Sequence, residues 1–316
     1  MAQSPDILAA ATPAVPEPSD TGDTLLTAAF MQRLDRLDIA SRRILSGKLM
    51  GERRSKKRGQ SVEFADYRNY VAGDDLRFID WNLYARLDKL FIRLFQEEED
   101  LSVSLIIDVS KSMRFGNPDK LLAAKRLAAA LGYIALTHYN RVALYAVSDT
   151  VNDSLRGLRG RRPVGQVMDF LKRQQPRDRS DLAAASREFA LRDHNKGVVI
   201  LLSDFLDKGD VSEALRFLTA SHRDVFALHI LSPQELDPGS AGVVGDLRLI
   251  DIEDDENTEV SAGGALLRQY KLTLRNYCES LRQTCLRRGA SYLLANTATP
   301  FETIVLDHLR KRGLLQ

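Results

Sequence analysis

Residues 102–112 read SVSLIIDVSKS, an apolar run that ends in Asp108, Ser110 and Ser112. A second apolar run, GVVILLSD at 197–204, has the same form and ends in Asp204. Short continuous apolar runs of this kind are typical of strands that are covered on both faces of a parallel sheet. The sequence therefore predicts two buried strands in one sheet, each with polar side chains at its carboxyl end.

Strand and helix patterns alternate along the chain from residue 101 onward. Further strands are expected at 141–147, 224–231 and 291–296, with an edge strand at 247–253. This alternation predicts an α/β fold with a doubly wound, mostly parallel sheet of the Rossmann-like type. The intervening helices are expected near 119–139, 163–174, 181–193, 211–221, 263–288 and 300–312.

The first hundred residues have a different organisation. Residues 1–22 are rich in Ala, Pro, Ser and Thr and are interpreted as a disordered leader. Residues 23–100 are interpreted as an N-terminal helix followed by a small β-rich unit, because aromatic strand patterns lie on both sides of a Gly-Asp-Asp turn signal. Residues 101–316 then form the α/β domain.

Composition restricts the class of protein. The 316 residues are 44% hydrophobic and 28% charged, as in an ordinary globular protein, and a net charge of +2 argues against bulk attraction to nucleic acid or membrane. Cys278 and Cys285 lie on one predicted helix about 10.5 Å apart, beyond the roughly 7 Å that a disulfide allows. No apolar stretch approaches the roughly 20 residues that a membrane span needs. A cytoplasmic protein with free thiols is expected.

The residues at the strand ends are suited to a metal ion. Ligands of open parallel sheets bind beyond the carboxyl ends of the strands, and Mg²⁺ prefers about six oxygen ligands, several of them water. Ser180, which precedes a predicted helix, offers a further hydroxyl, although it could instead be the N-cap of that helix. Mn²⁺ accepts the same ligands. The predicted ligands of Mg²⁺ or Mn²⁺ are Asp108, Ser110, Ser112, Ser180 and Asp204.

These motifs resemble, in order, the metal-ion-dependent adhesion site (MIDAS) of von Willebrand factor A-like domains. That pattern is Asp-x-Ser-x-Ser, then Thr, then Asp, and here Ser180 stands where Thr is usual. The resemblance implies a von Willebrand factor A-like fold. It also implies that an acidic side chain of a partner protein completes the metal shell.

The segment 61–99, SVEFADYRNYVAGDDLRFIDWNLYARLDKLFIRLFQEEE, resembles the signature of the bacterial domain-of-unknown-function 58 family. Thr299-Pro300-Phe301 is similar to a further motif of that family. The resemblance implies a partnership with a MoxR-type AAA+ ATPase in chaperone-like complex maturation. We therefore expect a metal-dependent protein-protein interaction module that is not an enzyme.

Charged and aromatic residues of the same segment have two interpretations. We favour a structural set of ion pairs that lock the β-rich unit onto the main domain. The alternative is a partner-binding surface. The residues concerned are Asp74, Asp75, Arg77, Asp80, Trp81 and Arg86.

Two other functions stay open from the sequence. A phosphatase-like, metal-dependent hydrolase could use Asp108 as nucleophile, but such enzymes need a second Asp where this chain has Ser110. A nucleic-acid-binding protein could use the basic run 53–58 and a second basic cluster, although the run 53–58 contains no interleaved aromatic residues. A Walker-type phosphate loop is absent from the sequence, so ATP hydrolysis is not expected. The second cluster comprises Arg156, Arg159, Arg161 and Arg162.

Overall fold

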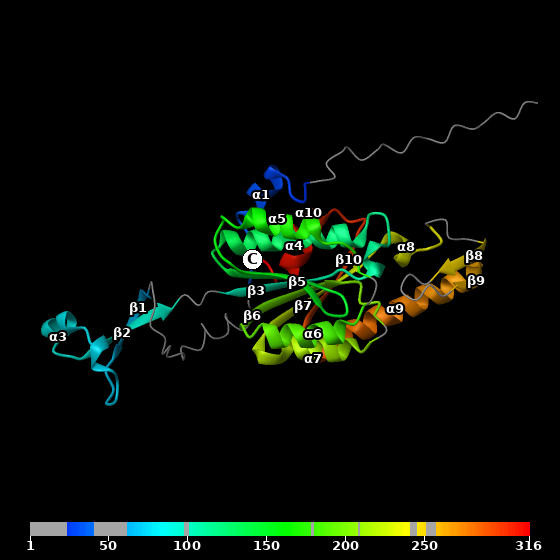
Figure 1. Cartoon of the computed structure of the whole chain (residues 1–316). Helices are drawn as coiled ribbons and strands as arrows, with labels where there is room; N and C mark the ends of the chain where they lie inside the picture. Colours follow the sequence, from blue (N-terminus) through cyan, green and yellow to red (C-terminus); the bar gives the residue numbers. More distant parts are fainter. Residues whose placement is uncertain are drawn as a thin grey trace, which may run out of the picture.

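The computed structural model describes residues 24–40, 62–97, 101–177, 180–207, 209–240, 245–250 and 257–316. Its centre is a six-stranded sheet in which neighbouring strands are parallel except for one antiparallel pair at an edge (Figure 1). In spatial order the strands are β10 (Ser291–Asn296), β7 (Asp224–Leu231), β6 (Gly197–Ser203), β3 (Ser102–Asp108), β4 (Arg141–Val147) and β5 (Val151–Leu158).

Helices cover both faces of this sheet, which confirms the predicted α/β layering (Figure 1). One face carries α1 (Ala28–Leu34), α4 (Lys120–Thr137), α5 (Val164–Arg173), α10 (Phe301–Thr303) and η4 (Ile304–Leu309). The other carries α6 (Leu182–Arg192), α7 (Val211–Thr219) and α9 (Gly264–Arg287). Short helical turns lie between these elements: η2 (Lys111–Arg114), η3 (Ala220–His222) and α8 (Pro233–Leu236).

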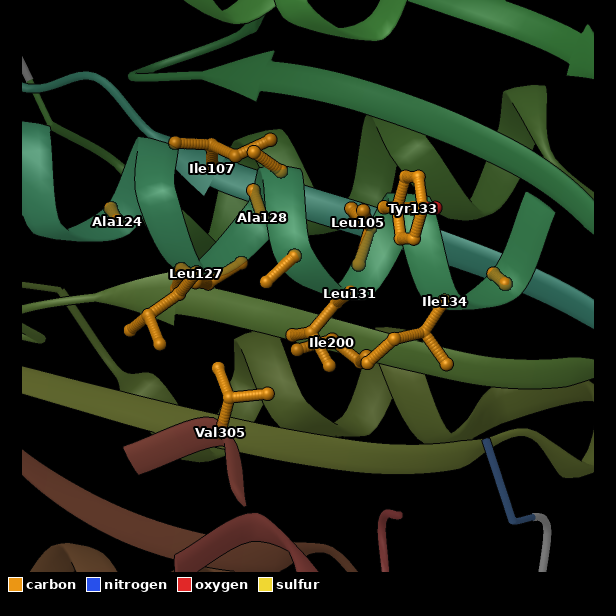
Figure 2. Close-up of a cluster of buried hydrophobic side chains, with 14 of the residues drawn as sticks. Leu105, Ile107, Ala124, Leu127, Ala128, Leu131, Tyr133, Ile134, Ile200 and Val305 are labelled. Atoms are coloured by element: carbon orange, nitrogen blue, oxygen red, sulfur yellow. The ribbon is translucent and has the colours of Figure 1, made fainter. Parts of the chain in front are cut away.

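The larger hydrophobic core lies between the sheet and α4. Leu105 of β3 and Ile200 of β6 face Leu127 and Leu131 of the helix, and all four are fully buried (Figure 2). An apolar helix without a polar face is typical of one enclosed by its own domain, and 14 of the 18 residues of α4 are buried. The strand that precedes α4 and the start of the helix are therefore held firmly in place.

Parallel pairing brings the two predicted polar strand ends together. β3 and β6 are direct neighbours, and their register runs from Ser102 opposite Gly197 to Ile107 opposite Leu202. The residues that follow both strands consequently lie on the same edge of the sheet, as the apolar patterns indicated.

Three strands differ from the sequence-based predictions. β5 was not predicted, because only Val151 and Leu158 of its eight residues are buried and the strand lacks an apolar pattern. The edge strand expected at 247–253 is instead β8 (Gly245–Ile250), which pairs with β9 (Asn257–Ala262) in a separate hairpin. β10 already occupies the sheet edge beside β7, so β8 is not an edge strand of the main sheet. β9 was not predicted.

The N-terminal β-rich unit is a hairpin separate from the main sheet (Figure 1). β1 (Val62–Asn69) and β2 (Phe91–Glu97) pair antiparallel, with η1 (Leu76–Phe78) and α3 (Trp81–Leu87) between them. The predicted leader 1–22 and the basic run 53–58 lie outside the described residues. In the described part of the chain, no helix is both long and apolar enough to cross a membrane.

The segment that precedes the β-rich unit belongs to the main domain. Phe30, Leu34 and Leu37 are buried in the same core as α4. Ile39 forms an antiparallel bridge with Leu315, next to the last residue of the chain. The main domain is therefore built from residues on both sides of the β-rich unit.

Gly197 gives a test of the β3–β6 contact. Its φ is +147°, and a Cβ at this position would lie 2.1 Å from the carbonyl oxygen of Ser102 on β3. We expect Gly197→Ala to lower the free energy of unfolding by about 2–4 kcal/mol in urea titrations. Gly165→Ala on α5, where a Cβ meets nothing within 4 Å, is the matched control. Equal stability of the two variants would contradict this account.

Candidate metal site

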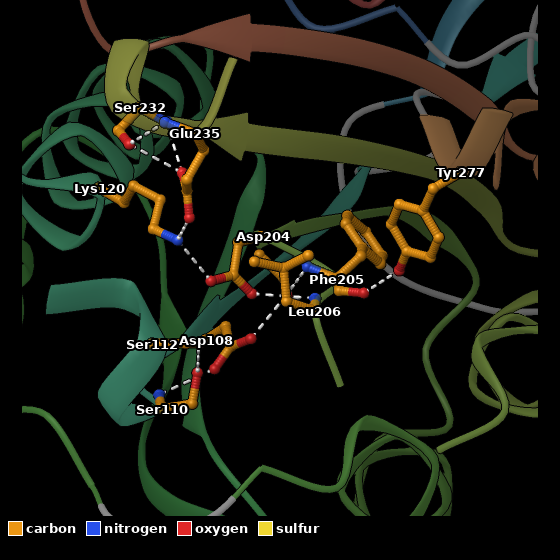
Figure 3. Close-up of polar contacts among 11 residues, drawn as sticks. Asp108, Ser110, Ser112, Lys120, Asp204, Phe205, Leu206, Ser232, Glu235 and Tyr277 are labelled. Atoms are coloured by element: carbon orange, nitrogen blue, oxygen red, sulfur yellow. Dashed lines mark hydrogen bonds and ion pairs between the residues drawn. The ribbon is translucent and has the colours of Figure 1, made fainter. Parts of the chain in front are cut away.

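Asp108 is the last residue of β3 and is 1% exposed. Its Oδ1 accepts a hydrogen bond from the backbone N–H of Ser110 at 2.8 Å. The hydroxyl oxygens of Ser110 and Ser112 lie 3.1 Å apart on the turn that follows (Figure 3). The structure therefore brings one carboxylate and two hydroxyls together, as the sequence predicts.

Ser203 is a member of this site that the sequence-based list of ligands omits. Its hydroxyl donates to Oδ2 of Asp108 at 2.6 Å and accepts from the backbone N–H of Phe205 at 2.8 Å. The signal was present, since Ser203 ends the apolar strand beside Asp204. Its side chain points to the neighbouring strand, and this cross-strand contact is what the sequence alone does not reveal.

Asp204 follows β6 and is 2% exposed. Its Oδ1 accepts from the backbone N–H of Leu206 at 3.1 Å, and its Oδ2 accepts from Nζ of Lys120 at 2.7 Å. Lys120 is fully buried at the start of α4 and also pairs with Glu235 of α8 (Figure 3). Sequence reasoning missed Lys120 and Glu235, because a charged residue at a helix end is most often solvated.

The buried charges of the site do not balance. Asp108, Asp204 and Glu235 can carry three negative charges, and Lys120 can supply one positive charge. Burial, reinforced by the negative charge of Asp204, raises the pKa of Asp108 to about 7. Burial also lowers the pKa of the neighbouring His229 to about 4, so this imidazole is neutral at pH 7. When all three carboxylates are ionised, two negative charges are in excess.

A divalent cation fits this donor set and this charge. Carboxylate and hydroxyl oxygens are the ligands that Mg²⁺ and Mn²⁺ prefer. Within the described residues, no three His, Cys, Asp or Glu side chains are grouped to hold a metal. An ion at this edge would therefore depend on the serine hydroxyls as well as on the carboxylates.

Ser180 lies on a segment that borders the same edge of the sheet. The N–H of Asp181 donates to the carbonyl of Ser148 after β4 at 3.1 Å, and that of Leu182 donates to Asp207 after β6 at 2.8 Å. The N-cap of α6 is Asp181, whose carboxylate accepts from Ala184. The alternative prediction that Ser180 caps this helix is therefore wrong.

The acidic residues of the β-rich unit are bound within that unit. Asp74 pairs with Arg68 at 2.9 Å, and Asp75 pairs with Arg77 at 2.6 Å. Asp80 caps α3 through two backbone N–H groups. Asp74 and Asp75 thus form ion pairs, as predicted, but these pairs join parts of the unit to each other and not to the main domain.

The same unit is remote from Asp108. β2 precedes the amino end of β3, whereas Asp108 ends that strand about 20 Å further on. Trp81 is 59% exposed and Arg86 is also exposed. The six residues singled out in this unit therefore do not join the metal site.

The contribution of Ser203 can be measured directly. Ser203→Ala removes the donor to Asp108 and the acceptor for Phe205, leaving both partners buried. We expect the free energy of unfolding to fall by about 1–3 kcal/mol, and the pKa of Asp108 to rise further. Ser280→Ala on the exposed surface of α9 is the control, with little effect expected. A neutral Ser203→Ala variant would show that this contact is not made in solution.

Comparison with known proteins matches the chain to one sequence family and to relatives from mycobacteria. A sequence model of the family described as "Protein of unknown function DUF58" matches residues 66–290. Uncharacterized proteins of Mycobacterium tuberculosis and Mycobacterium bovis are each 26% identical over 303 residues, which covers 94% of this chain and 93% of each relative. The family match includes both Asp108 and Asp204, together with most of the β-rich unit.

Two solved structures are similar over about two thirds of the chain. A conserved hypothetical protein, BatB, from Bacteroides thetaiotaomicron is 14% identical with a TM-score of 0.41, covering 67% of this chain and 98% of that one. The pilus adhesin SpaC from Lactobacillus rhamnosus GG is 16% identical with a TM-score of 0.40, covering 70% of this chain and 32% of that one.

Proposed function

This chain belongs to the DUF58 family, and from that premise we propose that it is a metal-dependent protein-interaction module with a von Willebrand factor A-like domain. Its partner in this proposal is a MoxR-type AAA+ ATPase, for which it acts as an adaptor in complex maturation. The observation that carries the proposal is a buried set of three carboxylates with only one ammonium among them, beside the hydroxyls of Ser110 and Ser112.

The residues of the site have distinct parts in this proposal. Asp108, Ser110 and Ser112 would hold Mg²⁺ or Mn²⁺, with Asp204 and Ser180 completing the share of the shell that this chain provides. Serine hydroxyls ligate without adding negative charge, so a bound ion supplies a positive centre that a carboxylate of the partner can ligate. The acidic side chain of the partner is thus the group that this site recognises.

A binding role is better supported than a hydrolytic one. Ser110 stands where a phosphatase of the type considered above needs a second carboxylate, and its hydroxyl lies against that of Ser112. The ammonium of Lys120 is engaged by two carboxylates. We also propose a cytoplasmic location, which the free thiols of Cys278 and Cys285 support.

Binding between purified proteins tests the proposal. The chain and a MoxR-type ATPase from the same genome are combined in Mg²⁺ or in EDTA, and association is followed by calorimetry. We expect binding in Mg²⁺ that EDTA abolishes and that Asp108→Asn weakens. Asp153→Asn is the matched control, because Asp153 pairs with Arg173 near the surface of β5.

Two results would count against this function. Association that persists in EDTA and in Asp108→Asn would remove the metal from the interaction. Turnover of generic phosphoesters that disappears in Asp108→Asn would favour the hydrolase instead.

A further inference from the structure

Lys120 is a buried cation held by two carboxylates from different parts of the chain. Its Nζ lies 2.7 Å from Oδ2 of Asp204 and pairs with Oε1 of Glu235 (Figure 3). The ring of Phe115 lies 5.8 Å from the same nitrogen. No part of the Lys120 side chain is exposed to solvent.

This ammonium is fixed in position. Burying a charge is costly unless partners compensate it, and both partners of Lys120 are themselves held. The second oxygen of Glu235 accepts from the backbone N–H of Ser232 at 2.7 Å and from its hydroxyl at 2.9 Å. The second oxygen of Asp204 accepts from Leu206. Both carboxylates that hold the Lys120 side chain are therefore held in turn by donors of the main chain or of Ser232.

We propose that Lys120 is an internal counter-charge that sets the cation affinity of the Asp108 site. It offsets one of three buried carboxylates and holds Asp204 by one oxygen, so the site keeps the charge that one divalent cation neutralises. Lys120 is thus a positioning and charge-setting residue and not a ligand. This inference rests on the proposed metal-binding function.

The proposal predicts whether the removal of each charge near the ion raises or lowers the affinity for the cation. A unit charge a few ångströms from a divalent ion changes its binding by about tenfold or more, even with the strong screening of a protein interior. Removing a negative charge at Glu235 should weaken binding. Removing the positive charge at Lys120 should strengthen it, and removing both should leave the affinity near its original value.

Calorimetric titration with Mg²⁺ and Mn²⁺ alone tests these directions. Glu235→Gln should weaken binding by about tenfold or more, and Lys120→Met should strengthen it by a similar factor. The double variant Lys120→Met, Glu235→Met should stay within about threefold of the original protein, because the net charge is unchanged. Glu279→Gln on the exposed face of α9 is the control for removing a distant carboxylate.

These variants distinguish an effect of charge on cation affinity from an effect of a disturbed structure. A residue with a purely structural role would lower the affinity in every variant, so unchanged or weaker binding in a folded Lys120→Met protein would overturn the inference. If Lys120→Met does not fold, Glu235→Gln and the double variant still decide: equal affinities in these two would overturn the inference, and a weaker Glu235→Gln would support it. Absence of cation binding in the original protein would instead overturn the proposed function itself.

Discussion

Asp108→Asn is expected to weaken Mg²⁺ binding by about a hundredfold or more, since loss of even an outer partner of a metal site typically costs 10- to 100-fold. Asparagine has nearly the shape of aspartate and can still accept from the N–H of Ser110, so the fold should be kept. Calorimetric titration of the metal-free protein measures the loss. Asp153→Asn should bind Mg²⁺ as tightly as the original protein does, because Asp153 lies on β5 near the protein surface.

The outcome that would contradict this prediction is specific. If Asp108→Asn and Asp153→Asn bind Mg²⁺ equally, the ion is held elsewhere and the strand-end site has no part in it. If only Asp108→Asn loses binding, the strand-end carboxylate is a ligand.

The second large effect is a loss, as the pH rises, of the stability that Asp108 contributes. Burial raises the pKa of Asp108 from 3.8 to about 7, so between these values the folded protein holds a proton that the unfolded chain has released. The contribution of Asp108 to the free energy of unfolding of the metal-free protein should therefore fall by about 3–4 kcal/mol from pH 4 to pH 7 and then level off. Mg²⁺ added at pH 8 should restore much of this loss, because the ion binds only the folded state.

Urea unfolding in EDTA at pH 5 and pH 8 measures this effect. His229 acts in the opposite direction. Because its pKa is lowered to about 4, the folded protein gains stability as the pH rises from there towards the ordinary pKa of an imidazole. Asp108→Asn keeps His229 and lacks the carboxyl group, so the difference between the two proteins isolates Asp108. Identical pH dependence in both would show that Asp108 does not carry the raised pKa.

The sequence was sufficient where structure is decided by neighbours along the chain. The apolar runs of β3 and β6 identified strands buried on both faces, and Asp108 and Asp204 follow them directly. Parallel sheets place ligand sites beyond such strand ends. The four residues Asp108, Ser110, Ser112 and Asp204 could therefore be placed at one sheet edge without coordinates.

The sequence was insufficient where partners are distant along the chain. Lys120 lies 84 residues before Asp204 and 115 residues before Glu235, and no local pattern indicates either pair. β5 escaped prediction because an exposed edge strand can do without the apolar pattern that reveals a central one. The ion pairs of the β-rich unit were expected, but their partners were assigned to the wrong part of the fold.

The bridge between Ile39 and Leu315 has a consequence for the architecture of the chain. Residues 24–40 share a core with α4, and β3 leads back into that core after β2. The β-rich unit is thus an insertion within one folded domain and not a separate unit at the N-terminal end of that domain. An insertion of this kind can be deleted without interrupting the main domain. We expect that a variant in which a short Gly-Ser linker replaces residues 62–97 keeps the cooperative thermal unfolding of the domain that contains the six-stranded sheet.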